Sequence, residues 1–323
     1  MVRHFLSEHD VSRKEYLELL ELTRKIKPVR FSKELEGKTL IMLFEKPSTR
    51  TRLSFEIGTT QLGGHAVFID ASTSQISRGE SMRDTAEVMS RYADVIMGRV
   101  FKHTTLSEMS LYATVPIING LSDLYHPCQG LADLFTIMEH KKKLKGLKVC
   151  FVGDGANNVT HSLMLASAIC GCDFYAGSPI GFEPKKSVVE AALRIAKETG
   201  SEIQVINDPM AAVMDADVVY TDTWFSMGKD CDKEQRRKIF APYQVNPELV
   251  SHAKPDYIFM HCLPAHIGEE VTAEVAYSKN SVIFDEAENR MHAQKALMLF
   301  LLGKHKKKTS VNNKRMIVKK KKK

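Results

Sequence analysis

The sequence predicts an α/β protein of two similar-sized domains, each a parallel sheet flanked by helices, with its functional site in the cleft between them. The 323 residues exceed the size of one ordinary hydrophobic core, so two domains are expected. In both halves, short β-branched apolar runs alternate with amphipathic segments of helical length. Ligands of such sheets lie at the carboxyl ends of the strands, so the functional residues are expected in the segments that follow the strands.

The elements follow from these runs. In the first half, strands are expected at 38–44, 65–70, 94–100 and 116–120, with helices near 50–62, 81–92, 104–113 and 127–140. The second half repeats the alternation, with strands at 147–153, 173–178, 203–206, 217–222, 257–262 and 281–284. Its helices are expected near 158–170, 184–198, 209–215 and 287–302.

The exposed, lysine-rich segment 138–146 is the expected domain boundary. It divides the chain into a first domain at 1–140 and a second at 141–303, with the last helix (about 287–302) packing back toward the first domain. Residues 304–323 form a basic tail without acids, expected to be disordered. No stretch approaches the ~18 apolar residues that a membrane helix needs, and the start of the chain lacks the apolar region of a signal peptide.

Charge and cysteine content narrow the functional class. The formal net charge is +7, but eleven Lys and Arg residues lie in 304–323, which leaves −4 on the rest. The tail has no aromatic residue or motif, so no specific nucleic-acid partner is expected, although weak binding of anionic polymers stays open. The six cysteines are scattered without a CxxC pair, which predicts neither a disulfide scaffold nor a zinc site and favours the cytoplasm: Cys128, Cys150, Cys170, Cys172, Cys231 and Cys262.

A segment suited to anion binding follows the first strand. The run 45–52 reads EKPSTRTR and leads directly into a helix. Free N–H groups and the helix dipole there favour an anion, which the hydroxyls of Ser48, Thr49 and Thr51 and the guanidinium of Arg50 can bind. An ordinary helix cap with solvated basic residues is the alternative. Two arginines in the first turn oppose the dipole unless an anion is present, and the P-loop pattern is absent.

A second polar segment lies between the strand at 116–120 and the next helix. His126 and Gln129 are three residues apart at a helix start and can face one ligand. The histidine donates to a carbonyl oxygen, and the amide oxygen accepts from N–H groups. A capping or packing histidine is the alternative, and Cys128 is expected to be packed. Arg99 follows the run DVIMG, near the end of the strand expected at 94–100.

Three strand ends in the second half also carry polar groups. Gly153 to Asn158 faintly resembles a dinucleotide fingerprint, but the third glycine is missing, so nucleotide binding is disfavoured. Asp222 begins DTWFSMG after a strand, and either binds an amine or caps a turn. Cys262 lies in HCLP at another strand end, where a buried, packed cysteine is the alternative.

FEKPSTRTRLSFE and HPCQGLADL resemble the two carbamoyl phosphate motifs of the aspartate and ornithine transcarbamoylase superfamily. GDGANN, DTWFSMG and HCLP resemble segments of its ornithine carbamoyltransferase members. The resemblance runs from about residue 4 to 302, with the motifs in order, and leaves out only the tail. It implies transfer of a carbamoyl group from carbamoyl phosphate to the δ-amine of L-ornithine, giving L-citrulline and phosphate, as in arginine metabolism, with no metal and no organic cofactor.

The resemblance also implies the residues of an active site in the interdomain cleft. Arg99 and His126 hold the oxyanion, and Cys262 is a catalytic residue beside the reacting amine. Carbamoyl phosphate is bound by Ser48, Thr49, Arg50, Thr51, Gln75, Arg99, His126, Gln129 and Arg290. Ornithine is bound by Asn158, Asp222, Ser226, Met227, Cys262 and Leu263. Gln75 reaches a neighbouring subunit's site, so a homo-oligomer is implied, a trimer or a multiple of trimers.

The chemistry poses one energetic problem. An alkyl ammonium group has a pKa of ~10.4, so freeing its amine costs ~4 kcal/mol near neutral pH. Desolvation in a closed cleft and a thiolate at Cys262 are the two expected ways to favour the neutral amine.

Related enzymes with other substrates are disfavoured by the same motifs. An aspartate enzyme is disfavoured because Cys262 replaces a proline, and a putrescine enzyme is disfavoured because the SMG sequence is present. STRTR argues against acetylornithine or succinylornithine as substrates. A non-catalytic protein that binds nucleic acid through its tail is the alternative from another class.

Overall fold

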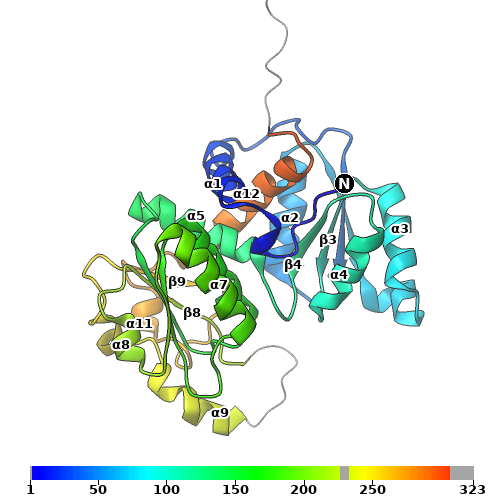
Figure 1. Ribbon diagram of the computed structural model, residues 1–323. Coiled ribbons are helices and arrows are strands. Elements are labelled where there is room, and N and C mark those ends of the chain that lie inside the picture. Colours follow the sequence, from blue (N-terminus) through cyan, green and yellow to red (C-terminus); the bar gives the residue numbers. More distant parts are fainter. Residues whose placement is uncertain (1, 226–232, 306–323) are drawn as a thin grey trace, which may run out of the picture.

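Two parallel β-sheets follow one another along the chain (Figure 1). The structure is a computed structural model that describes residues 2–225 and 233–305. The first sheet has the order β2-β1-β3-β4, with β1 at Thr39–Phe44, β2 at His65–Asp70, β3 at Val95–Arg99 and β4 at Ile117–Leu121. The second has the order β7-β6-β5-β8-β9, with β5 at Lys148–Val152, β6 at Asp173–Gly177, β7 at Ile203–Ile206, β8 at Val218–Thr221 and β9 at Ile258–His261. The predicted architecture of two parallel-sheet domains is confirmed.

Helices of the first half begin at capping residues that the sequence supplies. Ser12 and Glu15 form a capping box at the start of the first helix, and Ser48 and Ser81 cap the next two. The helices are α1 (Arg13–Ile26), α2 (Thr49–Gln61), α3 (Met82–Tyr92), α4 (His103–Tyr112) and α5 (Pro127–Lys141). Short 3-10 turns are η1 (Glu8–Asp10), η2 (Ala71–Thr73) and η3 (Gln75–Arg78).

The second half is built in the same way. Asn157 caps α6 through its side-chain oxygen, and Gly171 ends that helix in the left-handed conformation (φ 78°). The helices are α6 (Asn158–Cys170), α7 (Lys186–Thr199), α8 (Pro209–Val213), α9 (Lys233–Phe240), α10 (Pro247–Val250) and α11 (Ala273–Ala276), with a 3-10 turn η4 (Ala241–Tyr243).

The last helix, α12 (Ile283–Leu301), starts beside the second sheet and ends inside the first half of the molecule. It packs against α1, α2 and α5, where it is drawn in orange in Figure 1. One continuous hydrophobic core joins these helices to α6, with Leu20, Phe135, Leu163 and Leu297 all buried in it. The two halves of the molecule therefore share a core.

Two expectations need correction. Residues 281–284 are not a strand, because Ser281 makes only an isolated bridge to Phe259 and Ile283 already begins α12. A four-residue apolar run does not distinguish a strand from a buried helix start, and Asp285 and Glu286 favour the helix by complementing its dipole. The helices α1, α9, α10 and α11 were not predicted. Among the described residues, none of the helices has the length and apolar character needed to span a membrane.

Candidate active site

The first strand end places hydroxyls and guanidiniums around one threonine. Ser48 caps α2 by accepting a hydrogen bond from the Thr51 N–H at 3.3 Å. The Thr51 hydroxyl oxygen accepts from Arg99 Nη1 at 3.2 Å and from Arg290 Nη2 at 2.9 Å. Arg99 ends β3 directly beside the end of β1, and Arg290 comes from α12. Three elements distant in sequence therefore converge on the start of α2.

This cluster contains buried donors without acceptors. The Nε groups of Arg50, Arg99 and Arg290 have no hydrogen-bond partner among the described residues, and neither has Nδ1 of His126. Unpaired buried donors are costly, and those on neighbouring cations are costlier. An anion that accepts several hydrogen bonds removes this cost, and a phosphate suits guanidinium groups geometrically. The arrangement of these groups therefore suits an anion.

Burial and mutual repulsion shift the pKa values of these groups. Burial, with Arg290 and Arg50 close by, lowers the pKa of Arg99 to about 10, which still leaves it charged at neutral pH. Burial and the same cationic surroundings lower the pKa of His126 well below its usual value. His126 is therefore a neutral imidazole, which suits hydrogen bonding to a carbonyl oxygen better than holding a charge.

Gln129, in the first turn of α5, is held by two acids. Its Nε2 donates to Asp133 Oδ1 at 2.8 Å and to Glu286 Oε1 at 3.0 Å. Its buried oxygen has no partner among the described residues. The His126 backbone N–H donates to the Ser162 hydroxyl oxygen at 2.9 Å, which ties the start of α5 to α6. Gln129 thus offers a hydrogen-bond acceptor beside the imidazole donor.

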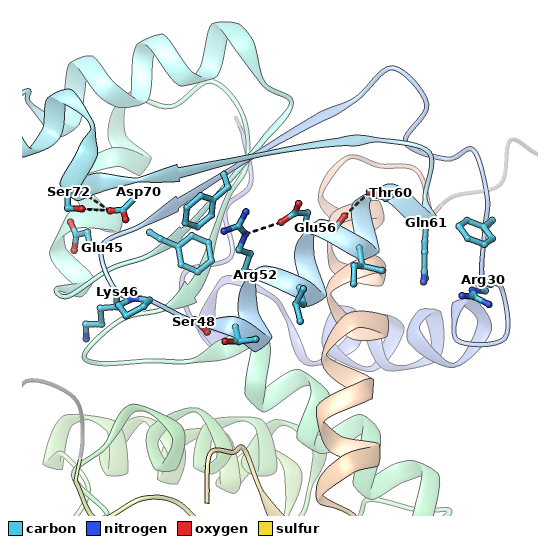
Figure 2. Close-up of a pocket in the computed structure, with 17 residues that line it drawn as sticks. Arg30, Glu45, Lys46, Ser48, Arg52, Glu56, Thr60, Gln61, Asp70 and Ser72 are labelled. Atoms are coloured by element: carbon cyan, nitrogen blue, oxygen red, sulfur yellow. Dashed lines mark hydrogen bonds and ion pairs between the residues drawn. The ribbon is translucent and has the colours of Figure 1, made fainter.

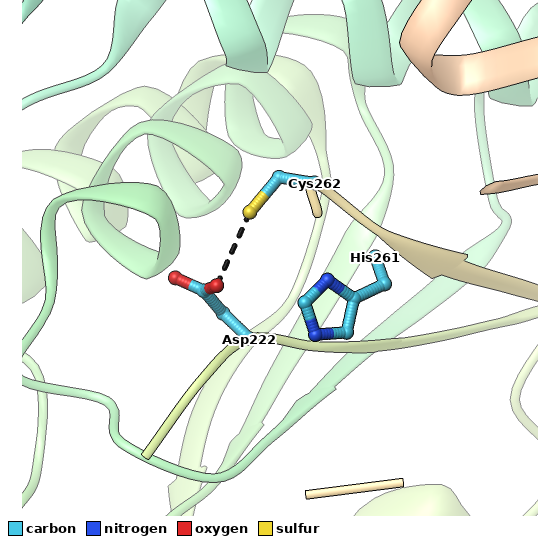
Figure 3. A group of neighbouring side chains, drawn as sticks. All are labelled: Asp222, His261 and Cys262. Carbon is cyan, nitrogen blue, oxygen red and sulfur yellow. Dashed lines mark hydrogen bonds between the residues drawn. The ribbon is translucent and has the colours of Figure 1, made fainter. Parts of the chain in front are cut away.

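The ends of β8 and β9 form the second half of the site (Figure 3). The Cys262 thiol donates to Asp222 Oδ1 at 3.2 Å, and the Thr223 N–H donates to the same oxygen at 2.8 Å. Burial raises the pKa of Asp222. Burial and the Asp222 carboxylate raise the pKa of the Cys262 thiol well above its usual value. This environment therefore favours the protonated thiol of Cys262 over the thiolate that was expected from the sequence.

The same residues have the donor types of a metal site. Ligand atoms of Asp222, His261 and Cys262 lie within 4.8 Å of one another, as do those of a second group, His266, Glu269 and Glu270. Both ring nitrogens of His261 are engaged, because Nδ1 accepts from the Leu263 N–H at 2.9 Å and Nε2 lies 3.1 Å from Glu270 Oε1. Hydrogen bonds among protein groups therefore explain why Asp222, His261 and Cys262 lie close together.

Two observations bring the two halves of the site together. Cys262, in the second half of the chain, interacts electrostatically with Arg99 and with Arg290. The Asn158 amide, at the start of α6, donates to the backbone oxygen of Ser122, just beyond β4. Arg50 and Cys262 therefore border a shared region between the sheets, as the fold class predicts.

The remaining residues of the predicted site differ in position. Leu263 follows Cys262 in the left-handed conformation (φ 59°) and leads into a cis proline. Asn157, which was not selected from the sequence, contacts Asp222 Oδ2 through its amide at 3.5 Å, whereas Asn158 faces the first half of the molecule. Ser226 and Met227 lie outside the described residues.

Sequence reasoning missed three charged residues near the anion cluster. Lys46 is half-buried, and burial together with Arg99 lowers its pKa. Lys46 lies within the motif FEKPSTRTRLSFE, so its place in that motif was a usable signal. Asp133 lies one helical turn beyond Gln129 and was also within reach of pattern reasoning. Glu286 is 157 residues from Gln129 along the chain, and no local pattern indicates their contact.

A groove of about 1020 Å³ adjoins the anion cluster on the outer side of the first sheet (Figure 2). It extends from Ser48 and Thr49 along the exposed face of α2, where Leu53 and Ile57 are exposed, toward Phe68 of β2. Gln75 is exposed in the loop after β2, and the structure shows no hydrogen bond from its side chain to any described residue. The loop is thus available for contacts outside its own chain.

Comparison with known proteins agrees with this geometry. Residues 3–139 match the family described as "Aspartate/ornithine carbamoyltransferase, carbamoyl-P binding domain", and residues 145–301 match its "Asp/Orn binding domain". The chain is 56% identical over 290 residues to a protein of Pyrococcus abyssi named ornithine carbamoyltransferase, covering 90% of each. A Bacillus subtilis protein of the same name is 51% identical over 302 residues, covering 94% of each. The solved ornithine carbamoyltransferase of Pyrococcus furiosus superposes with a TM-score of 0.90 at 52% identity, covering 93% of this chain and 97% of that one. The chain therefore belongs to the aspartate/ornithine carbamoyltransferase family.

Proposed function

We propose that this protein transfers the carbamoyl group of carbamoyl phosphate to the δ-amine of L-ornithine, giving L-citrulline and phosphate (EC 2.1.3.3). The observation that carries the proposal is the meeting of two unlike sites. The buried guanidinium groups of Arg99 and Arg290, each with an unpaired Nε, interact electrostatically with Cys262, which donates to Asp222. The ornithine carbamoyltransferases that cover almost the whole chain support the choice of the second substrate.

Carbamoyl phosphate takes the anion cluster. Its phosphate accepts hydrogen bonds from Ser48, Thr49, Arg50 and Thr51 at the start of α2, and from the unpaired guanidinium groups. Arg99 and neutral His126 hold the carbamoyl oxygen, Gln129 accepts from the carbamoyl NH₂, and Arg290 brings α12 to the same ligand. Because these donors are already in place, they stabilise the negative charge that develops on the carbonyl oxygen.

Ornithine takes the second side. The Asp222 carboxylate binds the cationic α-amine, Asn158 binds the α-carboxylate, and Leu263 and Cys262 lie beside the δ-amine. Ser226 and Met227, outside the described residues, complete this set. Cys262 acts as a thiol that desolvates and orients the amine, since the free thiolate is disfavoured there.

The reaction then needs only the neutral amine. Its nitrogen attacks the carbamoyl carbon and forms a tetrahedral intermediate whose oxyanion Arg99 and His126 hold. The C–O bond to phosphate breaks, and phosphate leaves with the proton that the amine loses. Excluding water from the cleft offsets part of the ~4 kcal/mol needed to free the amine. A Pyrococcus furiosus relative is named as the anabolic enzyme, which supports arginine biosynthesis as the direction.

The assembly belongs to the same proposal. A second copy covers the groove along α2 and brings its own Gln75 to this site, in a trimer or a multiple of trimers. The exposed Leu53 and Ile57 and the groove's continuity with Ser48 and Thr49 support this. A domain division at residues 140 and 141, a basic tail at 304–323 whose residues from 306 lie outside the described ones, and a cytoplasmic location stay predictions.

An assay with parallel substrates tests the function. We expect carbamoyl phosphate with ornithine to yield citrulline and phosphate in equal amounts, and putrescine or aspartate to react far more slowly. Faster turnover with putrescine or aspartate would contradict the choice of ornithine. Deletion of residues 304–323 should leave citrulline formation unchanged, whereas a protein working through its tail would lose its partner.

A further inference from the structure

The amide of Gln129 is fixed in one orientation by acids on both sides. Its two N–H groups point to Asp133 Oδ1 at 2.8 Å and to Glu286 Oε1 at 3.0 Å, all within the buried interior. One oxygen of each carboxyl group accepts from this amide, so an amide turned the other way would place its own oxygen against those two oxygens. The amide oxygen is thereby the side left unpaired.

Glu286 also accepts hydrogen bonds from groups on two further strands. The Tyr220 hydroxyl on β8 donates to its Oε1 at 3.0 Å, and the His261 backbone N–H on β9 donates to its Oε2 at 2.9 Å. With these donors in place, both oxygens of Glu286 accept hydrogen bonds. Burial raises the pKa of both the Glu286 and the Asp133 carboxyl groups, and the neighbouring charge of Asp133 raises that of Glu286 further. Among the described residues, two buried atoms of this network have no hydrogen-bond partner, the Gln129 side-chain oxygen and Asp133 Oδ2.

We propose that Glu286 and Asp133 are positioning residues that make this site selective for carbamoyl over other acyl phosphates. By holding both N–H groups of Gln129, they present its oxygen to the NH₂ of the carbamoyl group. A ligand with a methyl group in place of that NH₂ leaves the buried oxygen unpaired. The inference rests on the proposed carbamoyl phosphate site and adds the groups that set its acyl specificity.

The geometry explains why selectivity depends on residues that do not touch the ligand. A buried acceptor left without a donor costs free energy, so a fixed oxygen discriminates strongly between NH₂ and CH₃. If Gln129 were free to turn, its NH₂ group would face the ligand in part of the molecules and this penalty would weaken. Glu286 also accepts a hydrogen bond from the backbone N–H of His261, the residue before Cys262, so one side chain contacts both halves of the site.

Two stable analogues test the proposal, since they differ only in that group. Phosphonoacetamide carries the NH₂ and acetonylphosphonate carries a methyl in its place. Their dissociation constants, measured by calorimetry, give a selectivity ratio. We expect wild type to prefer the amide at least tenfold and Glu286→Leu to lose about tenfold of that ratio, the equivalent of one or two hydrogen bonds. Asp285→Asn is the matched control, because the neighbouring Asp285 is exposed and pairs only with His140 at 3.0 Å. It should leave the ratio unchanged.

A double-mutant cycle separates positioning from general damage. In a Gln129→Leu background, Glu286→Leu should change the ratio by less than twofold, because its effect passes through Gln129. An unchanged ratio in a folded Glu286→Leu protein, or an equal loss in the Gln129→Leu background, overturns the proposal. If Glu286→Leu does not fold, the wild-type ratio still decides, since a preference below threefold overturns it. A wild type that forms citrulline but lacks this preference refutes only this inference, whereas one that forms no citrulline refutes the proposed function.

Discussion

Arg236 on α9 holds the segment that directly follows Asp222, the residue proposed to bind the α-amine of ornithine. Its guanidinium forms an ion pair with Asp154 and donates to the backbone oxygen of Trp224. The carbon at its centre lies 4.8 and 4.9 Å from the ring centroids of Phe182 and Phe240. Arg236 is 6% exposed and Asp154 is fully buried. The replacement Arg236→Leu keeps much of the apolar contact and removes the charge.

The expected loss of stability follows from this burial. Removing one partner of a buried ion pair leaves the other charge uncompensated and costs ~3–5 kcal/mol of unfolding free energy. Arg237 provides a matched control on the same helix, since it pairs with Glu269 at 2.6 Å but its side chain is 53% exposed. Exposed pairs contribute ~0–1 kcal/mol, so Arg237→Leu should be nearly neutral. The two variants differ by one position and in burial.

Urea denaturation measures the difference. Trp224 is the only tryptophan of the chain and is itself buried, so its fluorescence reports on this region, and circular dichroism reports on the whole fold. We expect a much lower midpoint for Arg236→Leu, a near-wild-type midpoint for Arg237→Leu, and a raised KM for ornithine with an unchanged KM for carbamoyl phosphate in Arg236→Leu. Equal midpoints for the two variants would refute the reasoning from burial.

Three further predictions test the site and its surroundings. Arg99→Met should lower kcat for citrulline formation by ~100- to 1,000-fold, the usual effect of losing one oxyanion donor; a loss below tenfold would remove Arg99 from that role. Iodoacetamide at pH 8 should alkylate Cys262 more slowly than it alkylates glutathione, because burial and Asp222 raise the thiol's pKa; mass spectrometry that finds faster labelling would show a thiolate. Burial raises the pKa of Glu8 to about 8, above its unfolded value. Its protonated form therefore supports the fold at low pH, and this support is lost as pH rises toward 8, by up to ~1.4 kcal/mol per pH unit. Between pH 5 and 8 the melting temperature of wild type should fall relative to that of Glu8→Gln. A difference in melting temperature that stays constant over this range would argue against the prediction.

Much of the fold and of the anion cluster follows from local patterns. Parallel strands bring their carboxyl ends to one edge, so the segments after β1, β3 and β4 were expected to meet, and Thr51, Arg99 and His126 do lie at those ends. The motif order along the chain then led to the family. The strand at 281–284 failed because four apolar residues carry too little periodicity to separate strand from helix.

The remaining features depend on contacts between distant segments. Gln129 on α5 donates hydrogen bonds to Asp133 on the same helix and to Glu286 on α12, and no sequence pattern indicates the contact with α12. The protonation of Cys262 depends on burial and on Asp222, 40 residues away, so the sequence could suggest a reactive cysteine but not its charge state. The directions in which the Asn157 and Asn158 amides point were equally beyond reach, because the geometry of the helix start fixes them.

The path of α12 has a consequence for how the two halves of the molecule depend on each other. The chain crosses between them twice, once after α5 and once through a helix whose final turns are buried among α1, α2 and α5. A fragment that ends before α12 would expose the apolar surfaces of α1, α2 and α5 that pack against this helix. The second half alone would carry α12 with its apolar residues exposed to solvent. Cleavage of the 142–146 connection should therefore leave both pieces associated, and any opening of the cleft must bend both crossings in concert.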